Sequence, residues 1–152
     1  MKKNNLLSNV LTGSNNALLS SGILIIRLTI GILLFAAGSG KARGWFGGYG
    51  VEKTLQGFAH MGFSSFLTYL SMYTEFIGGL LLILGFLTRF AAFAVTINMI
   101  VATIVSLPRG FLGPTGAQTA FVFLMMALVI LLSGPLTYSL DHIIFLRYHD
   151  KK

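Results

Sequence analysis

The sequence predicts an all-α membrane protein: a bundle of four transmembrane helices with a short interfacial helix between the first and the second. Hydrophobic residues make up 55% of the 152 residues and charged residues only 10%, whereas ordinary soluble domains carry about 25% charged residues. The apolar residues also fall in runs of about 20, the length at which a helix crosses a bilayer. A soluble chain of this size could not bury so much apolar surface, so residues 1–152 are expected to form a single integral membrane domain.

The four expected transmembrane helices span residues 18–38, 65–86, 90–107 and 117–138. These runs are too long for membrane strands and lack the alternation of apolar and polar residues that strands show. The fourth helix could end at Ser133–Pro135 or continue beyond the proline with a kink. A cleaved signal peptide is a competing interpretation of the first run, but Arg27 interrupts its apolar stretch.

The connection between the first two helices, residues 39–64, is long and contains the predicted interfacial helix. Trp45 and Tyr49 are expected to anchor it at the headgroup boundary, where aromatic side chains with a polar end are common. Within residues 51–59 the apolar side chains share one helical face and the polar ones lie on other faces. Helices two and three are joined by only a few residues, so they are expected to be antiparallel neighbours.

The distribution of basic residues predicts that both termini lie in the cytoplasm. Cytoplasmic loops carry the excess of Lys and Arg, and this orientation places six such residues inside and four outside. The inner set is Lys2, Lys3, Arg89, Arg147, Lys151 and Lys152, and the outer set is Lys41, Arg43, Lys53 and Arg109. The net charge of +7 comes from residues that stand singly between apolar runs, which favours anionic lipid over nucleic acid as the partner.

Arg27 and Glu75 are the residues that cost the most energy, because each lies inside an apolar span. Measured from the ends of their spans, their depths differ by only about 3 Å, so we expect them to pair across adjacent helices. Such a pair could line a polar site for a quinone headgroup or a small anion, could relay a proton, or could only fix the helix packing. Alternatively, Arg27 could extend its side chain to the inner membrane surface. Lys41 is expected either to anchor at the headgroups or to close the outer end of the same site.

Three further polar residues are expected to have structural roles. Asn98 is the strongly polar side chain of the third span and is expected to form an interhelical hydrogen bond rather than to bind a ligand. Arg89 and Asp141 lie at the same boundary of the bundle, and a bridge between them would tie its two ends together, at a gain of at most about 1 kcal/mol.

Several kinds of chemistry are not expected of this chain. It has no cysteine, which excludes disulfides and thiolate-held iron–sulfur clusters. His60, His142 and His149 lie outside the spans, so a pair of histidines could not hold a haem within the bundle. No histidine and carboxylate cluster has the spacing of a metal site, and no phosphate-binding loop or nucleophile motif occurs. We therefore predict no catalytic residue, no metal ligand and no covalently bound cofactor.

A family resemblance rests on short segments spread over nearly the whole chain. These segments are Ile26-Arg27-Leu28 with Gly31, Gly38 to Lys41, Glu75-Phe76-Ile77-Gly78-Gly79, Leu84 to Arg89, and Ser139-Leu140-Asp141. In them the chain resembles the DoxX family of small four-helix bacterial membrane proteins, which implies a multi-pass protein of the bacterial inner membrane. The family is named for a subunit associated with thiosulfate:quinone oxidoreductase, so the resemblance implies a membrane partner of a redox enzyme. By analogy, Arg27, Lys41 and Glu75 would be its polar positions of interest.

The favoured expectation is therefore a membrane subunit, or partner, of a soluble or membrane redox enzyme, with a quinone or small-anion site at Arg27, Lys41 and Glu75. The first alternative is a structural or scaffolding membrane protein in which the Arg–Glu pair only sets helix packing. The second is a small proton-coupled transporter. A short bundle lacks the broken helices common at transport sites, so this alternative would require a homo-oligomer.

Overall fold

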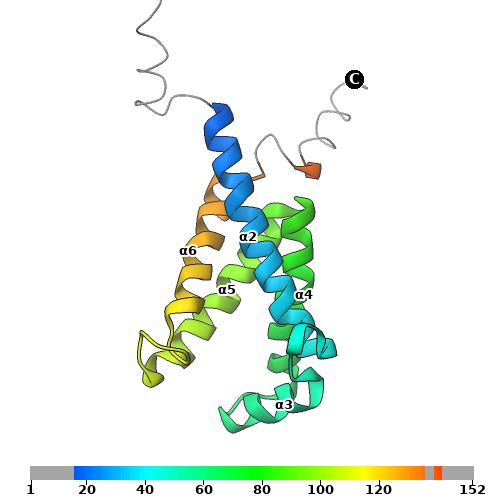
Figure 1. Cartoon of the computed structure of the whole chain (residues 1–152), viewed down its shortest axis with the longest axis vertical. Helices are drawn as coiled ribbons and strands as arrows, with labels where there is room; N and C mark the ends of the chain where they lie inside the picture. The colour runs from blue at the N-terminus through cyan, green and yellow to red at the C-terminus, as the bar shows by residue number, and fades with distance from the viewer. Residues whose placement is uncertain (1–15, 136–138, 142–152) are drawn as a thin grey trace, which may run out of the picture.

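The protein is an all-helical bundle, as predicted, and no strand occurs in the part of the chain that is described. A computed structural model describes residues 16–135 and 139–141. Its helices are α2 (Asn16–Arg43), η1 (Trp45–Gly47), α3 (Gly50–His60), α4 (Ser65–Leu84), α5 (Thr88–Ser106), η2 (Leu107–Arg109) and α6 (Gln118–Ser133). The helices α2, α4 and α5, the last extended by η2, are long and apolar enough to cross a membrane, and α6 is a shorter apolar helix. Figure 1 shows the four running alongside one another, with α3 across one end.

Two helices have bounds that differ from those expected. The first continues to Arg43 rather than ending at residue 38, so Lys41 belongs to a transmembrane helix and not to the connection. The last helix ends at Ser133, where Gly134 takes a positive φ of 76°, and at 16 residues it is about 24 Å long. The end expected for it, at residue 138, lies outside the described residues. So do Lys2, Lys3, Arg147, Lys151, Lys152, His142 and His149, and the predicted orientation therefore stays a prediction.

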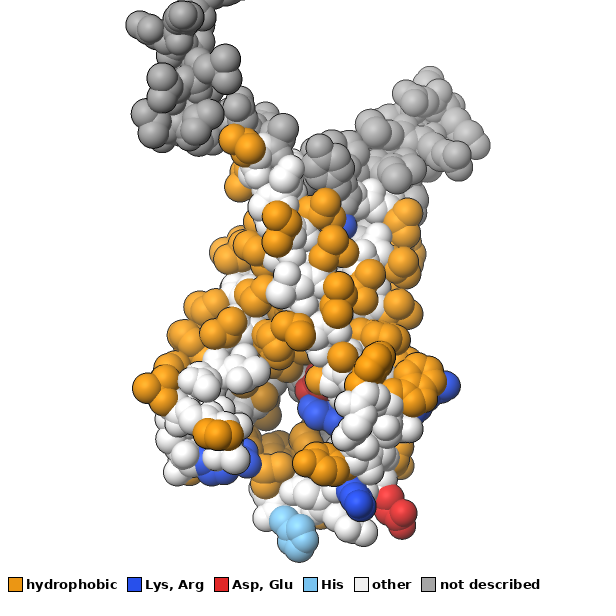
Figure 2. Space-filling view, viewed as in Figure 1, with side chains coloured by type: hydrophobic (Ala, Val, Ile, Leu, Met, Phe, Trp, Pro, Cys, Tyr) orange, Lys and Arg blue, Asp and Glu red, His pale blue; other side chains and the backbone are white. Residues whose placement is uncertain are grey.

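The core lies where α2, α4, α5 and α6 meet. Its buried members are Ile30, Leu34, Leu82, Ala91, Ala92, Val95, Met99, Ala127 and Ile130. Large apolar side chains are also exposed on the outside of the bundle, among them Ile25, Phe66 and Leu132 at 64%, 73% and 79%. Figure 2 shows hydrophobic side chains over most of the visible face, with charged ones gathered mainly toward the α3 end. Such a surface fits lipid and not water.

Glycines bring α2 and α4 into backbone contact and set their antiparallel register. A Cβ added to Gly79 would lie 2.5 Å from the backbone nitrogen of Phe35, and one on Gly38 would collide with the backbone of Phe76. Farther along, Gly31 meets Ile83 in the same way. Small residues at these positions allow helices to approach closely in a membrane, where packing rather than water exclusion drives association.

Asp141 caps the start of α5, which corrects the predicted bridge between Arg89 and Asp141. Its carboxylate accepts hydrogen bonds from the backbone N–H groups of Leu87, at 2.8 Å, and Thr88, at 2.9 Å. These groups lie at a helix N-terminus, where backbone donors have no partner within the helix and negative charge is favoured. Arg89 instead lies beside Gly134, at the end of α6.

The glycine contact yields a stability prediction with a control on the same helix. We expect Gly38→Ala to lower the free energy of unfolding by about 1–3 kcal/mol, because the new methyl group meets backbone that cannot move aside. Gly22→Ala is the control, since nothing lies within 4 Å of a Cβ there, and it should be neutral or slightly stabilising. Unfolding in detergent micelles measures both. Equal stabilities of the two variants would contradict the observed helix register.

Candidate functional site

The ion pair within the bundle joins Lys41 of α2 to Glu75 of α4. The Lys41 ammonium donates to both carboxylate oxygens, with Nζ–Oε1 and Nζ–Oε2 distances of 2.6 and 2.7 Å. The Glu75 side chain is 6% exposed and that of Lys41 is 32% exposed. It is the one salt bridge between side chains of the described residues. A carboxylate so deeply buried requires such a partner, because an isolated charge in hydrocarbon costs several kcal/mol.

The predicted pair of Arg27 with Glu75 is wrong, because the register of α2 and α4 separates them. Extending the contacts Gly38–Phe76 and Gly31–Ile83 places Glu75 beside the last turns of α2, and Arg27 level with the end of α4. These levels are about 18 Å apart. The N-terminal turns of α2 reach beyond α4 (Figure 1), so depths counted from the ends of the two spans do not correspond.

Side-chain direction increases this separation. Side chains on a helix lean toward its N-terminus. On antiparallel helices, Glu75 therefore leans toward the α3 end of the bundle, while Arg27 leans toward the opposite end. Lys41, close to the C-terminus of α2, leans back into the bundle and reaches the carboxylate. The same rule thus brings Lys41 to Glu75 and takes Arg27 away.

Arg27 is buried at the opposite end, where it holds the segment after α6. It is 3% exposed, and its Nη1 donates to the carbonyl oxygen of Pro135 at 3.4 Å. A Cβ on Gly85 would lie 2.8 Å from Nη1 and 3.0 Å from the Cα of Ser139. Asp141 supplies a favourable Coulomb interaction. Arg27 therefore connects α2 to the segment that follows α6, and it does not line the cavity beside Glu75.

A cavity of about 690 Å³ opens beside the Lys41–Glu75 pair, between α4 and α5 and beneath α3. Ligand pockets typically enclose about 300–1,000 Å³. Most of its lining is apolar, for example Leu70, Phe93 and Val101. Figure 2 shows a hollow in this part of the molecular surface. The cavity therefore combines apolar walls with a few polar groups, the usual pattern of a site for a small organic molecule.

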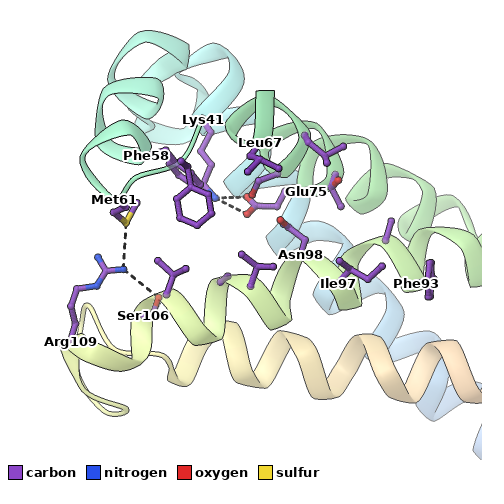
Figure 3. Close-up of a pocket in the computed structure, with 18 of the residues that line it drawn as sticks. Lys41, Phe58, Met61, Leu67, Glu75, Phe93, Ile97, Asn98, Ser106 and Arg109 are labelled. Atoms are coloured by element: carbon purple, nitrogen blue, oxygen red, sulfur yellow. Dashed lines mark hydrogen bonds and ion pairs between the residues drawn. The ribbon is translucent and has the colours of Figure 1, made fainter. Parts of the chain in front are cut away.

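Asn98 of α5 contributes a polar group to the same cavity (Figure 3). Its amide nitrogen is buried and has no hydrogen-bond partner among the described residues, so the expected interhelical hydrogen bond is not formed by this atom. A buried donor left without a partner costs about 1–3 kcal/mol. An acceptor brought by a ligand would remove that cost.

The α3 end of the cavity is closed by residues of the first and third connections. Arg109 of η2 contacts Met61 after α3, with an Nη2–Sδ distance of 3.9 Å, and Ser106, with an Nη2–Oγ distance of 3.4 Å. The Lys41 ammonium lies 5.9 Å from the ring centre of Phe58 in α3. In Figure 3 these side chains surround the opening beside the Lys41–Glu75 pair.

The structure thus assembles only part of the predicted site. Lys41 and Glu75 come together and Arg27 does not. Asn98, expected to be structural, lines the cavity. Phe58 and Arg109 line it as well, although the sequence indicated only that Phe58 belongs to the interfacial helix and that Arg109 is one of the outer basic residues. The expected anchors Trp45 and Tyr49 are exposed near the α3 end, 46% and 78%. The signal that could have identified Asn98 is its helical spacing from other cavity residues of α5, such as Ala94 and Ala102.

A double-mutant cycle tests the revised pairing. Lys41→Met alone leaves the Glu75 carboxylate buried without a partner, so we expect a loss of about 3–5 kcal/mol of unfolding free energy. Adding Glu75→Gln should restore much of this loss. The same cycle for Arg27→Met with Glu75→Gln should be additive within about 0.5 kcal/mol, since these residues share no contact. Coupling of Glu75 to Arg27 and not to Lys41, measured by unfolding in micelles, would contradict the structure.

Comparison with known proteins supports the family resemblance. A profile of the DoxX family matches residues 22–108. The chain is also 31% identical over 125 residues to a protein of Bacillus subtilis (strain 168) named "Putative oxidoreductase CatD", a match that covers 82% of this chain and 87% of the relative. No solved structure matches. The matched segment includes α4, α5 and the Lys41–Glu75 pair between the first two long helices, and the chain belongs to the DoxX family.

Proposed function

We propose that this protein binds a quinone headgroup beside Lys41, Glu75 and Asn98, and that it serves as a membrane subunit or partner of an oxidoreductase. The observation that carries the proposal is a buried ion pair, next to an unpartnered buried amide, at the edge of a cavity whose remaining walls are mostly apolar. The name of the relative in Bacillus subtilis adds support for a role in oxidoreduction.

The polar groups suit a ligand with carbonyl acceptors. A lysine ammonium has three N–H donors, and Lys41 directs hydrogen bonds to the two oxygens of Glu75. One donor is left for a ligand oxygen. Asn98 of α5 also lines the cavity, and rotation of its side-chain amide would turn the buried nitrogen toward a ligand as another donor. Two donors on different helices match the two carbonyl oxygens of a quinone ring, while residues such as Phe93 and Val101 supply apolar contact.

The proposed ligand also gives the ion pair a role in proton exchange. Reduction of a quinone to a quinol consumes two electrons and two protons. Glu75 and Lys41 both line the cavity, and the Lys41 side chain is partly exposed, at 32%. We propose that the pair orients the headgroup and exchanges protons with it. Because the chain has no cysteine and no histidine in its apolar spans, we propose that the electrons come from a partner protein.

The alternatives fit the observations less well. A role in helix packing alone would explain the ion pair but not the unpartnered buried nitrogen of Asn98 or the adjoining cavity. The transport hypothesis draws on the central carboxylate, but α2, α4 and α5 are continuous helices where the structure describes them, without the breaks common at transport sites.

Binding of a short-chain benzoquinone and a short-chain naphthoquinone to the protein in lipid nanodiscs tests the proposal. We expect Lys41→Met/Glu75→Gln to weaken binding at least about tenfold, because charge-assisted hydrogen bonds contribute about 1.5–3 kcal/mol. Asn98→Leu should have a smaller effect in the same direction. Isothermal titration calorimetry measures the affinities.

The matched control is Lys53→Met/Glu52→Gln, which removes the same charges from exposed positions on α3. This control should bind like the wild type. A wild-type protein that binds neither quinone, or equal affinities in both double variants, would reject the quinone site. If the first double variant changed only the unfolding free energy, the ion pair would have a packing role alone.

A further inference from the structure

A second cavity, of about 240 Å³, continues from the first along the surface between α4 and α5. The two cavities share four lining residues, Leu70, Thr74, Phe90 and Ala94. They therefore form one continuous groove, which begins at the Lys41–Glu75 pair and runs toward the turn between α4 and α5. From Thr74 to Leu81, the last α4 residue of the second cavity, it extends about 10 Å along the helix.

The second cavity differs from the first in its chemistry. Ile77 and Leu81 of α4 line it on one side, and none of its lining residues is charged. The small residues Gly78, Ala91 and Ala94 also line it; Gly78 and Ala91 are themselves buried, and Ala94 is half-buried. Ile77 is 49% exposed and Phe90 is 68% exposed, so the groove opens sideways on the outer face of the bundle, which is covered by lipid in a membrane.

We propose that the second cavity binds the apolar side chain of the same quinone whose headgroup lies beside Lys41 and Glu75. This inference rests on the proposed function and extends it: the ligand is a lipid-phase quinone with a long apolar chain, and it reaches the site sideways from the bilayer between α4 and α5. Continuity with the polar cavity supports this occupant, because a molecule with its head at Lys41 has the groove as the apolar path leading away from it.

The physical basis of chain binding is close packing. Lipid is as apolar as the groove, so transfer of the chain from lipid gains little from the hydrophobic effect, and dispersion contacts must hold it. The half-buried Ala94 allows a chain to approach the backbone of α5, and Ile77 and Leu81 provide side-chain contacts. The headgroup thus fixes the position of the chain, and labelling of the groove should depend on the polar pair.

Photolabelling in nanodiscs tests this prediction directly. Two quinone analogues are used, one with a diazirine next to the ring and one with a diazirine at the end of a long chain. The ring-proximal probe should label residues of the first cavity, and the chain-end probe should label α4 between Tyr73 and Leu81. Excess unlabelled long-chain quinone should reduce both at least fivefold, and in Lys41→Met/Glu75→Gln the competitor should no longer reduce chain-end labelling of the groove.

Controls separate the groove from the bulk membrane. Ile32 and Leu33 of α2 are exposed and lie outside both cavities, so any labelling there should not respond to competitor. Ile77→Ala/Leu81→Ala should lower chain-end labelling of the groove at least threefold without changing ring-proximal labelling, whereas Ile32→Ala/Leu33→Ala should change neither.

Each result has a distinct meaning. Chain-end labelling that spreads evenly over lipid-facing residues and ignores competitor would overturn the groove inference, while competed ring-proximal labelling would leave the proposed function intact. If long-chain quinone reduced neither ring-proximal nor chain-end labelling of the wild type, the proposed function itself would be overturned. A phospholipid with a diazirine on its acyl chain is the last arm: groove labelling that long-chain quinone fails to reduce would assign the groove to bulk lipid and overturn the inference.

Discussion

A carboxylate held in the hydrocarbon region is the constraint on which this structure depends. Glu75 is 6% exposed, and Lys41 neutralises it through two short hydrogen bonds. For that contact to form, α2 must remain helical through the segment Gly38-Ser39-Gly40 and must approach α4 at backbone distance. Gly38 meets the backbone of Phe76, the residue next to Glu75, so the closest contact of the two helices adjoins the ion pair. Helix packing and the polar site are thus consequences of one arrangement.

Arg27 and Lys41, two of the three basic residues of α2, lie toward opposite ends of the bundle. Arg27, at one end, contacts Pro135 and lies near Asp141, whose carboxylate caps α5. Lys41, at the other end, holds Glu75 beside the large cavity. Arg27 therefore stabilises the connection between the last helix and the turn of α4 and α5, while Lys41 lines the cavity. In a bundle that is otherwise apolar, this division confines the polar site to the α3 end.

The sequence was sufficient to predict the helical class, the long apolar helices and the presence of an amphipathic helix before α4. It also drew attention to Glu75, because charge in an apolar span has few explanations, and named Lys41 as a residue that would anchor at the headgroups or close the same site. The binding role of both residues stays a prediction. The sequence could not predict their partnership, which depends on the register of α2 against α4. That register is fixed by backbone contacts at Gly31, Gly38 and Gly79, whereas a Cβ on Gly22 of the same helix α2 would have nothing within 4 Å.

Other features also depend on three-dimensional packing. Asn98 looked like a residue for interhelical hydrogen bonding, but α4 and α5 diverge enough at its level to leave a cavity. Asp141 looked like a partner for Arg89, whereas the unpaired backbone donors at the start of α5 bind it. Each polar side chain has several possible partners, and the backbone determines which of them lies within hydrogen-bonding distance. The pattern of charges in the sequence does not contain that information.

Solid-state NMR in lipid bilayers can determine the Lys41–Glu75 contact directly. The glutamates of this chain are Glu52 and Glu75, so ¹³C at glutamate Cδ and ¹⁵N at lysine Nζ give a simple dipolar-recoupling experiment. The structure predicts an Nζ–Cδ distance of about 3–4 Å, and the corresponding dephasing should disappear in Lys41→Met. Dephasing that survives this substitution, or that arises from ¹⁵N-labelled arginine in place of lysine, would contradict the arrangement described here.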